Sequence, residues 1–165
     1  MDDKAKAQFR RALGAFATGV AVVTVDHPDG GVAGLTVNSF TSVSLDPPLV
    51  LWSVGAASDR GTWFRAAERF VINILGAEDA ALAAECARRG HPHIDAARVD
   101  RAAPGEPPAV LGALSRLFCR THARVPMGDH LLMIGEVTAF ETRAGDGLTY
   151  FRGRYGRAPT PQEDL

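Results

Sequence analysis

The sequence predicts a mainly β protein, built as an antiparallel barrel with helices packed outside it. Short runs rich in β-branched residues recur along the chain, separated by clusters of turn-forming residues, as in antiparallel β folds. Helical periodicity is confined to a few segments between these runs. There is no GxGxxG after a predicted strand, no P-loop and no GxSxG elbow, so a doubly wound nucleotide-binding fold is disfavoured.

Length and composition narrow the class of protein. At 165 residues with a net charge of −1, the chain is predicted to form one domain, residues 1–165, with enough chain for a core. It lacks a Lys/Arg block, which argues against nucleic acid and anionic membranes as partners. The charged N-terminus predicts neither a signal peptide nor a membrane span. Two cysteines, Cys86 and Cys119, are too few for a secreted disulfide framework, so we expect a cytoplasmic protein.

The first third of the chain predicts a helix followed by three strands. Phe9, Leu13 and Phe16 recur at helical spacing, and the next two runs flank a cluster of turn formers, which indicates a hairpin. Two prolines then interrupt the β pattern, because neither can donate to a sheet ladder. The third strand is apolar on both faces and is therefore expected inside the sheet. The expected elements are a helix over 4–16, strands over 19–26, 32–43 and 49–54, and a turn over 27–31.

The rest of the chain alternates strands with short helices. Acidic residues at the start of one predicted helix suit its dipole, and Leu82 and Cys86 share one face of it. Cys119 lies in a strand-like run and is expected to be a small buried residue. Residues 90–108 have scattered prolines and little periodicity, which predicts a long surface loop. We expect helices over 62–69 and 78–89, strands over 70–75, within 109–125, over 131–142 and over 148–152, and a polar tail from 157.

One polar stretch, GLTVNSFTSVSLDPP over 34–48, lies between apolar runs. Buried hydroxyls and amides need partners, and a ligand rich in donors and acceptors would supply them. The simpler interpretation is an edge strand or loop whose side chains bond to the neighbouring backbone. Periodicity alone favours this simpler interpretation.

Three other groups can carry chemistry. His130, beside Asp129, lies at a strand entrance and is either structural or a partly exposed imidazole that meets a ligand. The run YFRGRYG over 150–156 is either a clamp for a planar or phosphorylated ligand or an ordinary dimer rim. The loop 55–61 and the helix after it form a candidate phosphate seat.

Metal binding and protein-nucleophile chemistry are both disfavoured. His91, His93 and His122 lack a matching cysteine or carboxylate cluster in the sequence, so no metal is expected. Because no nucleophile–base pair stands out, the inventory suits hydride transfer between bound cofactors, in which the protein supplies orientation and electrostatics.

Five motifs in register carry a resemblance to a known family. FATGVAVVT, GLTVNSFTSVSLDPPLVLWS, RFVINIL, GDHLLMIGEV and YFRGRYG resemble, in this order, the short-chain flavin reductases, the reductase components of two-component flavin-dependent monooxygenases. The resemblance covers the chain from about Phe9 to Gly156. It implies an FMN-binding split β-barrel that works as a homodimer, with flavin near the subunit interface.

The resemblance also implies the site residues. Its histidine at the nicotinamide site maps to His130, which is the catalytic candidate. The implied flavin and nicotinamide contacts are Thr36, Val37, Asn38 and Ser39 at the ring and ribityl chain, Trp52 and Ser53 at the following strand end, Ala57, Ser58, Arg60 and Thr62 at the phosphate, and Arg152, Gly153 and Tyr155 in the closing element.

The implied activity is hydride transfer from NADH or NADPH to FMN or FAD, with the reduced flavin supplied to a separate monooxygenase. Hydroxyls and backbone N–H groups of the 36–39 segment would stabilise the anionic reduced ring. One competing hypothesis is a split-barrel flavin carrier or sensor without NAD(P)H turnover, and another is a dimeric β-barrel interaction protein. His130 and the YFRGRYG run favour the enzyme, because a carrier needs no nicotinamide site.

Overall fold

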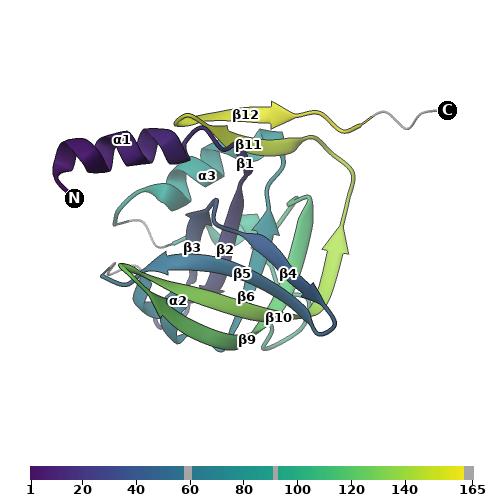
Figure 1. The fold of residues 1–165 in the computed structure, drawn as a ribbon. Helices are drawn as coiled ribbons and strands as arrows, with labels where there is room; N and C mark the ends of the chain where they lie inside the picture. The colour runs from purple at the N-terminus through teal and green to yellow at the C-terminus, as the bar shows by residue number, and fades with distance from the viewer. Residues whose placement is uncertain (58–60, 91–92, 162–165) are drawn as a thin grey trace.

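A computed structural model describes residues 1–57, 61–90 and 93–161. Its main feature is a seven-stranded sheet in the order β3-β2-β6-β9-β10-β5-β4, and every strand pair in it is antiparallel (Figure 1). The strands are β1 Thr18–Gly19, β2 Ala21–Asp26, β3 Val32–Val37, β4 Thr41–Leu45, β5 Pro48–Gly55, β6 Arg69–Ile74, β7 Val99–Asp100, β8 Ala109–Val110, β9 Ser115–Met127, β10 His130–Thr142, β11 Gly147–Phe151 and β12 Arg154–Ala158.

The helices are few and short, which confirms the mainly β prediction. The α-helices are α1 Asp3–Leu13, α2 Gly61–Ala66 and α3 Ala80–Ala87, and the 3₁₀ turns are η1 Ala77–Asp79 and η2 Ala96–Arg98. Asp2 caps α1 by accepting the Ala5 N–H at 2.7 Å. No helix among the described residues is long and apolar enough to cross a membrane.

The predicted strand over 32–43 is wrong in its second half. β3 ends at Val37 and pairs with β2, whereas β4 begins at Thr41 and pairs with β5. Residues 38–40 leave the ladder, so the chain crosses from one edge of the sheet to the other. Because β3 and β4 are the two edges, the sheet is not closed by hydrogen bonds among the described residues, and the expected barrel closure is absent there.

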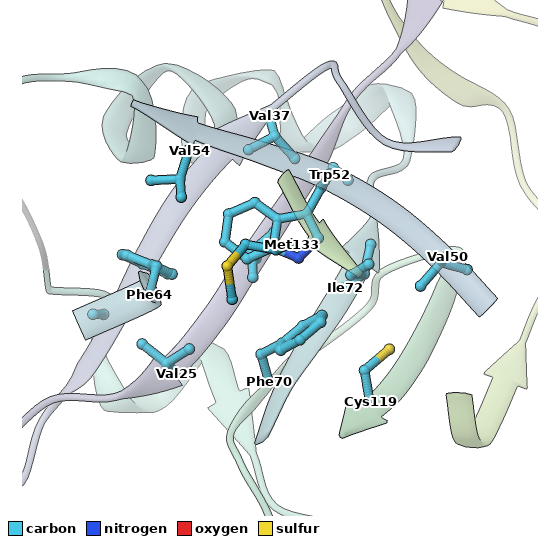
Figure 2. Close-up of a cluster of buried hydrophobic side chains, with 13 residues drawn as sticks. Val25, Val37, Val50, Trp52, Val54, Phe64, Phe70, Ile72, Cys119 and Met133 are labelled. Atoms are coloured by element: carbon cyan, nitrogen blue, oxygen red, sulfur yellow. The ribbon is translucent and has the colours of Figure 1, made fainter. Parts of the chain in front are cut away.

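The main core lies against one face of this sheet. Trp52, Phe70 and Met133 are fully buried there (Figure 2). The Trp52 and Phe70 rings pack edge to face, with their centroids 5.6 Å apart. Only alternate residues of β5 enter the core, so its predicted burial on both faces is wrong: Leu51 and Ser53 stay half-buried on the outer face. Gly135 of β10 allows close packing, because a Cβ there would meet the Phe70 ring at 2.6 Å.

A small polar network is buried beside this core. The Asn73 amide donates to the Val22 carbonyl at 2.9 Å and to the Thr24 hydroxyl at 3.0 Å, and its oxygen accepts the Val110 N–H at 2.7 Å. The Thr24 hydroxyl in turn donates to the Pro108 carbonyl. This network joins β2, β6 and β8, and every polar side chain in it has a partner.

A second layer covers the end of the sheet (Figure 1). The small sheet β1-β11-β12 and α3 enclose another core, which includes Leu82, Cys86 and Leu148. The predicted loop over 90–108 is partly ordered, because η2 lies in it and β7 pairs with β8. The predicted tail begins too early, since Arg157 lies in β12 and forms ion pairs with Glu78 and with Asp146.

Candidate active site

His130 is presented by the hairpin that joins β9 to β10. It pairs across the hairpin with Met127, and Gly128 turns the chain at a φ of 60°. The His130 Nδ1 lies 2.6 Å from the Asp129 carboxylate, whose pKa is lowered by this hydrogen bond. Because an ionised carboxylate only accepts, Nδ1 carries the proton and Nε2 is left for a ligand. Since 49% of its side chain is exposed, His130 is an accessible imidazole fixed in one tautomer.

The predicted phosphate loop lies directly beside His130. Gly55 is the cross-strand partner of His130, and the Ala56 N–H donates to the Asp129 carbonyl at 2.9 Å. Ala57 is exposed at the start of this loop. The hydroxyl of Thr62, the second residue of α2, accepts a hydrogen bond from Arg65 at 3.1 Å. Ser58 and Arg60 lie outside the described residues.

A cavity of about 550 Å³ opens where β1, β2 and the 38–40 crossing meet. Asn38 and Ser39 line it, and the Ser39 hydroxyl accepts the Ser53 N–H at 3.0 Å. The Thr18 hydroxyl belongs to the same wall and is buried without a hydrogen-bond partner among the described residues. An ordered water or a bound ligand would supply the missing hydrogen bond. The lining residues are Phe16, Ala17, Thr18, Gly19, Val20, Ala21, Asn38, Ser39, Phe40, Thr41 and Ile74.

Strand β5 connects this cavity to His130. Ser53 touches Ser39, and Gly55, two residues further along, pairs with His130. Residues two apart on a strand share a face and lie about 7 Å from each other. This is the outer face of the sheet, because Trp52 and Val54 point into the core. The polar cavity and the imidazole are therefore neighbours on one surface.

Three predicted ligand residues point their side chains away from this surface. The Thr36 hydroxyl donates to the Ala83 carbonyl of α3 at 2.7 Å, and the Val37 and Trp52 side chains are buried in the main core. Only their backbone can face a ligand on the outer surface. The role predicted for these three positions stays a prediction with that restriction.

Sequence reasoning missed the wall of the cavity that is formed by Phe16, Thr18 and Phe40. Phe16 and Thr18 belong to the FATGV run, which is part of the family resemblance but was given no role in the predicted site. The available signal was the threonine between small residues, just before a buried strand. Its unpartnered hydroxyl, however, can be recognised only in three dimensions.

The Arg152–Gly153 pair forms the turn between β11 and β12. Both residues have positive φ, 47° and 83°, which is the geometry of a tight two-residue hairpin loop. Arg10 and Arg11 of α1 line a cavity of about 510 Å³ with this turn. Tyr155 instead packs on Tyr150, with the two ring centroids 5.3 Å apart. Burial raises the pKa of Tyr155. None of these residues lines the cavity that contains Asn38.

Two of the histidines considered for a metal, His93 and His122, belong to different groups of side chains among the described residues. His122 lies 3.9 Å from Glu136, and His91 is outside the described residues. His93 instead lies near His27 and Asp29.

Comparison with known proteins identifies the family. Residues 13–159 match the model of the flavin reductase like domain. The chain belongs to this family. It is 45% identical over 150 residues to the NADH-dependent FMN reductase SmoA of Agrobacterium fabrum, covering 90% of this chain and 84% of that protein.

Two further similarities extend this result. The reductase component of a 4-nitrophenol 4-monooxygenase/4-nitrocatechol 2-monooxygenase from Rhodococcus opacus is 36% identical, covering 92% of this chain and 80% of that protein. The solved NADH:FAD oxidoreductase of Streptomyces globisporus, in complex with NAD and FAD fragments, superposes with a TM-score of 0.87 at 34% identity, covering 99% of this chain and 98% of that one. The resemblance inferred from the five motifs is confirmed.

The residues of the cavity fit a flavin. An isoalloxazine ring has apolar faces and a polar edge of carbonyl and nitrogen groups. The cavity offers two aromatic side chains, Phe16 and Phe40, together with the Asn38 amide and the unpartnered Thr18 hydroxyl. Its volume is within the range of small-molecule sites.

Proposed function

We propose that this protein is an NAD(P)H:flavin oxidoreductase that transfers a hydride from NADH or NADPH to FMN or FAD. The observation that carries the proposal is the cavity on the His130 face of the sheet, in which Thr18 has a buried hydroxyl without a partner among the described residues. Related proteins use NADH with either FMN or FAD, which supports the activity and leaves both flavins as candidates.

Bound flavin supplies the hydride-accepting ring, and the chain supplies binding and orientation. Asn38, Ser39 and Thr18 provide hydrogen bonds for the polar edge of the ring, and Phe16 and Phe40 exclude water from its faces. His130 offers Nε2 to the nicotinamide carboxamide, with Asp129 holding the imidazole in place.

The other predicted contacts keep their proposed roles. Backbone groups of Thr36 and Val37, and of Trp52 and Ser53, border the ring site. The loop beside His130 receives the flavin phosphate through Ala57, Ser58, Arg60 and Thr62. The closing element Arg152, Gly153 and Tyr155 contributes to the nicotinamide site.

The decisive experiment follows NADH absorbance with purified protein, without flavin and then with added FMN or FAD. Turnover that rises with flavin and saturates is the expected result, because flavin then behaves as a substrate. Flavin binding without oxidation of NADH or NADPH would contradict the reductase and indicate a carrier. Absence of flavin binding would contradict both.

We also propose that the chain works as a homodimer. β4 is an edge strand, Leu45 on it is 93% exposed, and Phe140 on β10 is 72% exposed. α1 buries none of its residues. Apolar surface next to an open sheet edge is stabilised by a second subunit.

Light scattering during gel filtration tests the dimer. The expected mass is that of two chains, and Leu45→Glu is expected to yield monomers. The matched control is Leu111→Glu, which alters an exposed leucine outside β4 and should leave the dimer intact. A wild-type mass of one chain would contradict the proposal.

The partner that receives reduced flavin is proposed to be a monooxygenase. The similarity to a monooxygenase reductase component supports this.

We propose that residues 1–165 form one flavin reductase-like domain, folded as a split barrel. We place it in the cytoplasm, where NADH is available and where buried thiols such as those of Cys86 and Cys119 stay reduced.

A further inference from the structure

Three side chains with metal-ligand chemistry meet at the turn between β2 and β3. His27, Asp29 and His93 each offer one ligand-type atom, and these atoms lie within 4.8 Å of one another. None of the three lines the cavity assigned to flavin. The cluster is therefore independent of the proposed reductase site.

The backbone positions the cluster from two distant segments. The turn is closed by the His27 N–H, which donates to the Gly31 carbonyl at 2.9 Å. His93 forms an isolated antiparallel bridge with Ala33, next to the Ile94 N–H, which donates to the Val32 carbonyl at 2.9 Å. These bonds hold His93 over the turn.

Gly31 leaves the space that His93 occupies. A Cβ at Gly31 would lie 2.9 Å from the His93 Nδ1 and 3.2 Å from the Asp29 carboxylate. A side chain at this position would therefore force the His93 ring or the Asp29 carboxylate to shift.

The Asp29 carboxylate lies between the two imidazoles. Its Oδ1 is 2.5 Å from the His27 Nδ1, and its Oδ2 is 3.5 Å from the His93 Nε2. The Gly31 N–H donates to Oδ1 at 3.0 Å. This N–H and the His27 ring lower the pKa of Asp29, so the group is an anion at neutral pH.

The buried edge of His27 completes the argument. Its Nε2 is buried without a hydrogen-bond partner among the described residues. The centroids of the His27 and Trp63 rings lie 4.1 Å apart, in an edge-to-face arrangement. The other ring nitrogen of His27, Nδ1, faces the Asp29 carboxylate. Without an ion, the Nδ1 proton bridges these two groups, and an ion that binds Nδ1 displaces it.

We propose that His27, Asp29 and His93 bind a divalent transition metal ion of the Zn²⁺ class, through one nitrogen of each imidazole and one carboxylate oxygen. Imidazole ligands select such ions over Mg²⁺ and Ca²⁺, and three protein ligands leave a fourth position for water. The ion joins the β2–β3 turn to the segment before Ile94. The contact between the His27 and Trp63 rings links the metal site to α2, which contains Trp63.

The test is calorimetric titration of tag-free, chelator-treated protein with Zn²⁺, together with Co²⁺ absorption spectra. We expect one ion per chain and Co²⁺ bands typical of a four-coordinate site. His93→Gln is the informative variant because 47% of the His93 side chain is exposed, so its loss leaves the fold intact. It should weaken binding by at least about tenfold. Asp29→Asn should do the same.

The matched control is His122→Gln, which removes an equally exposed histidine, 46% exposed, from β9. It should bind Zn²⁺ as the wild type does. Zn²⁺ should also raise the melting temperature of the wild type and not that of His93→Gln. A lack of saturable Zn²⁺ binding, or binding that His93→Gln leaves unchanged, would overturn the proposal and leave the cluster as a hydrogen-bonded turn.

Discussion

Two groups of polar side chains in neighbouring parts of this molecule differ in how their hydrogen bonds are met. In the Asn73–Thr24 network, the amide and the hydroxyl both have protein partners, although both residues are fully buried. In the cavity wall, the Thr18 hydroxyl is buried without a partner among the described residues. The first group stabilises the fold, and we propose that the second serves a bound ligand.

The largest effect is expected at the satisfied network. Asn73→Ala should lower the free energy of unfolding by about 3 kcal/mol, because it leaves the Val22 carbonyl and the Val110 N–H without their partner. Urea unfolding measures this.

Asn38→Ala is the matched change in the cavity wall, where the side chain is exposed. It should alter stability by less than about 0.5 kcal/mol and weaken flavin binding instead. Equal destabilisation by the two variants would remove the distinction between a structural and a ligand-binding amide.

The next effect concerns His130, a polar group oriented by a protein partner yet open to solvent. His130→Ala should raise the KM for NADH by about tenfold, or about 1.4 kcal/mol, and leave the flavin Kd within about twofold. Steady-state kinetics and flavin fluorescence measure the two quantities. His122→Ala, on β9, is the control and should change neither. Equal losses in both quantities for His130→Ala would contradict its role at the nicotinamide.

Sequence predicted much of the fold because strand preference is local. The β-branched runs that became β2, β5, β6 and β10 were recognisable. The error over 32–43 arose because strand propensity continues through Asn38 and Ser39, whereas the break between the two sheet edges depends on which distant strands pair. The order of the loop over 90–108 likewise comes from tertiary contacts, among them the pairing of β7 with β8.

The candidate site was predictable where the side chains of a motif lie on the surface. His130 and Asn38 are exposed, and Ser39 lines the same cavity as Asn38, as a ligand site there would require. Strand alternation turned Trp52 inward, and Thr36 bonds to α3, which no local pattern indicates. Thr18 was missed because a threonine in a β-branched run resembles any strand residue until its burial and its lack of a partner are seen.

The smallest effect gives the sharpest contrast, because one substitution can be made in both groups. Thr18→Val removes an unpartnered buried hydroxyl at constant shape, so stability should stay unchanged or rise by up to about 1 kcal/mol. Flavin binding should weaken by about fivefold, or about 1 kcal/mol, as the hydrogen bond to the ligand is lost.

Thr24→Val makes the same change where the hydroxyl is used, accepting from Asn73 and donating to Pro108. It should lower the free energy of unfolding by about 1–3 kcal/mol, because both partners are left buried and unmet, and it should not alter the flavin Kd. Urea unfolding and fluorescence titration of both variants separate the outcomes. If Thr18→Val destabilised the protein as much as Thr24→Val and left flavin binding unchanged, the Thr18 hydroxyl would be structural, and the cavity would lose its strongest claim to the flavin. If Thr18→Val weakened only flavin binding and Thr24→Val lowered only stability, the two results would locate flavin at this wall without any assay of turnover.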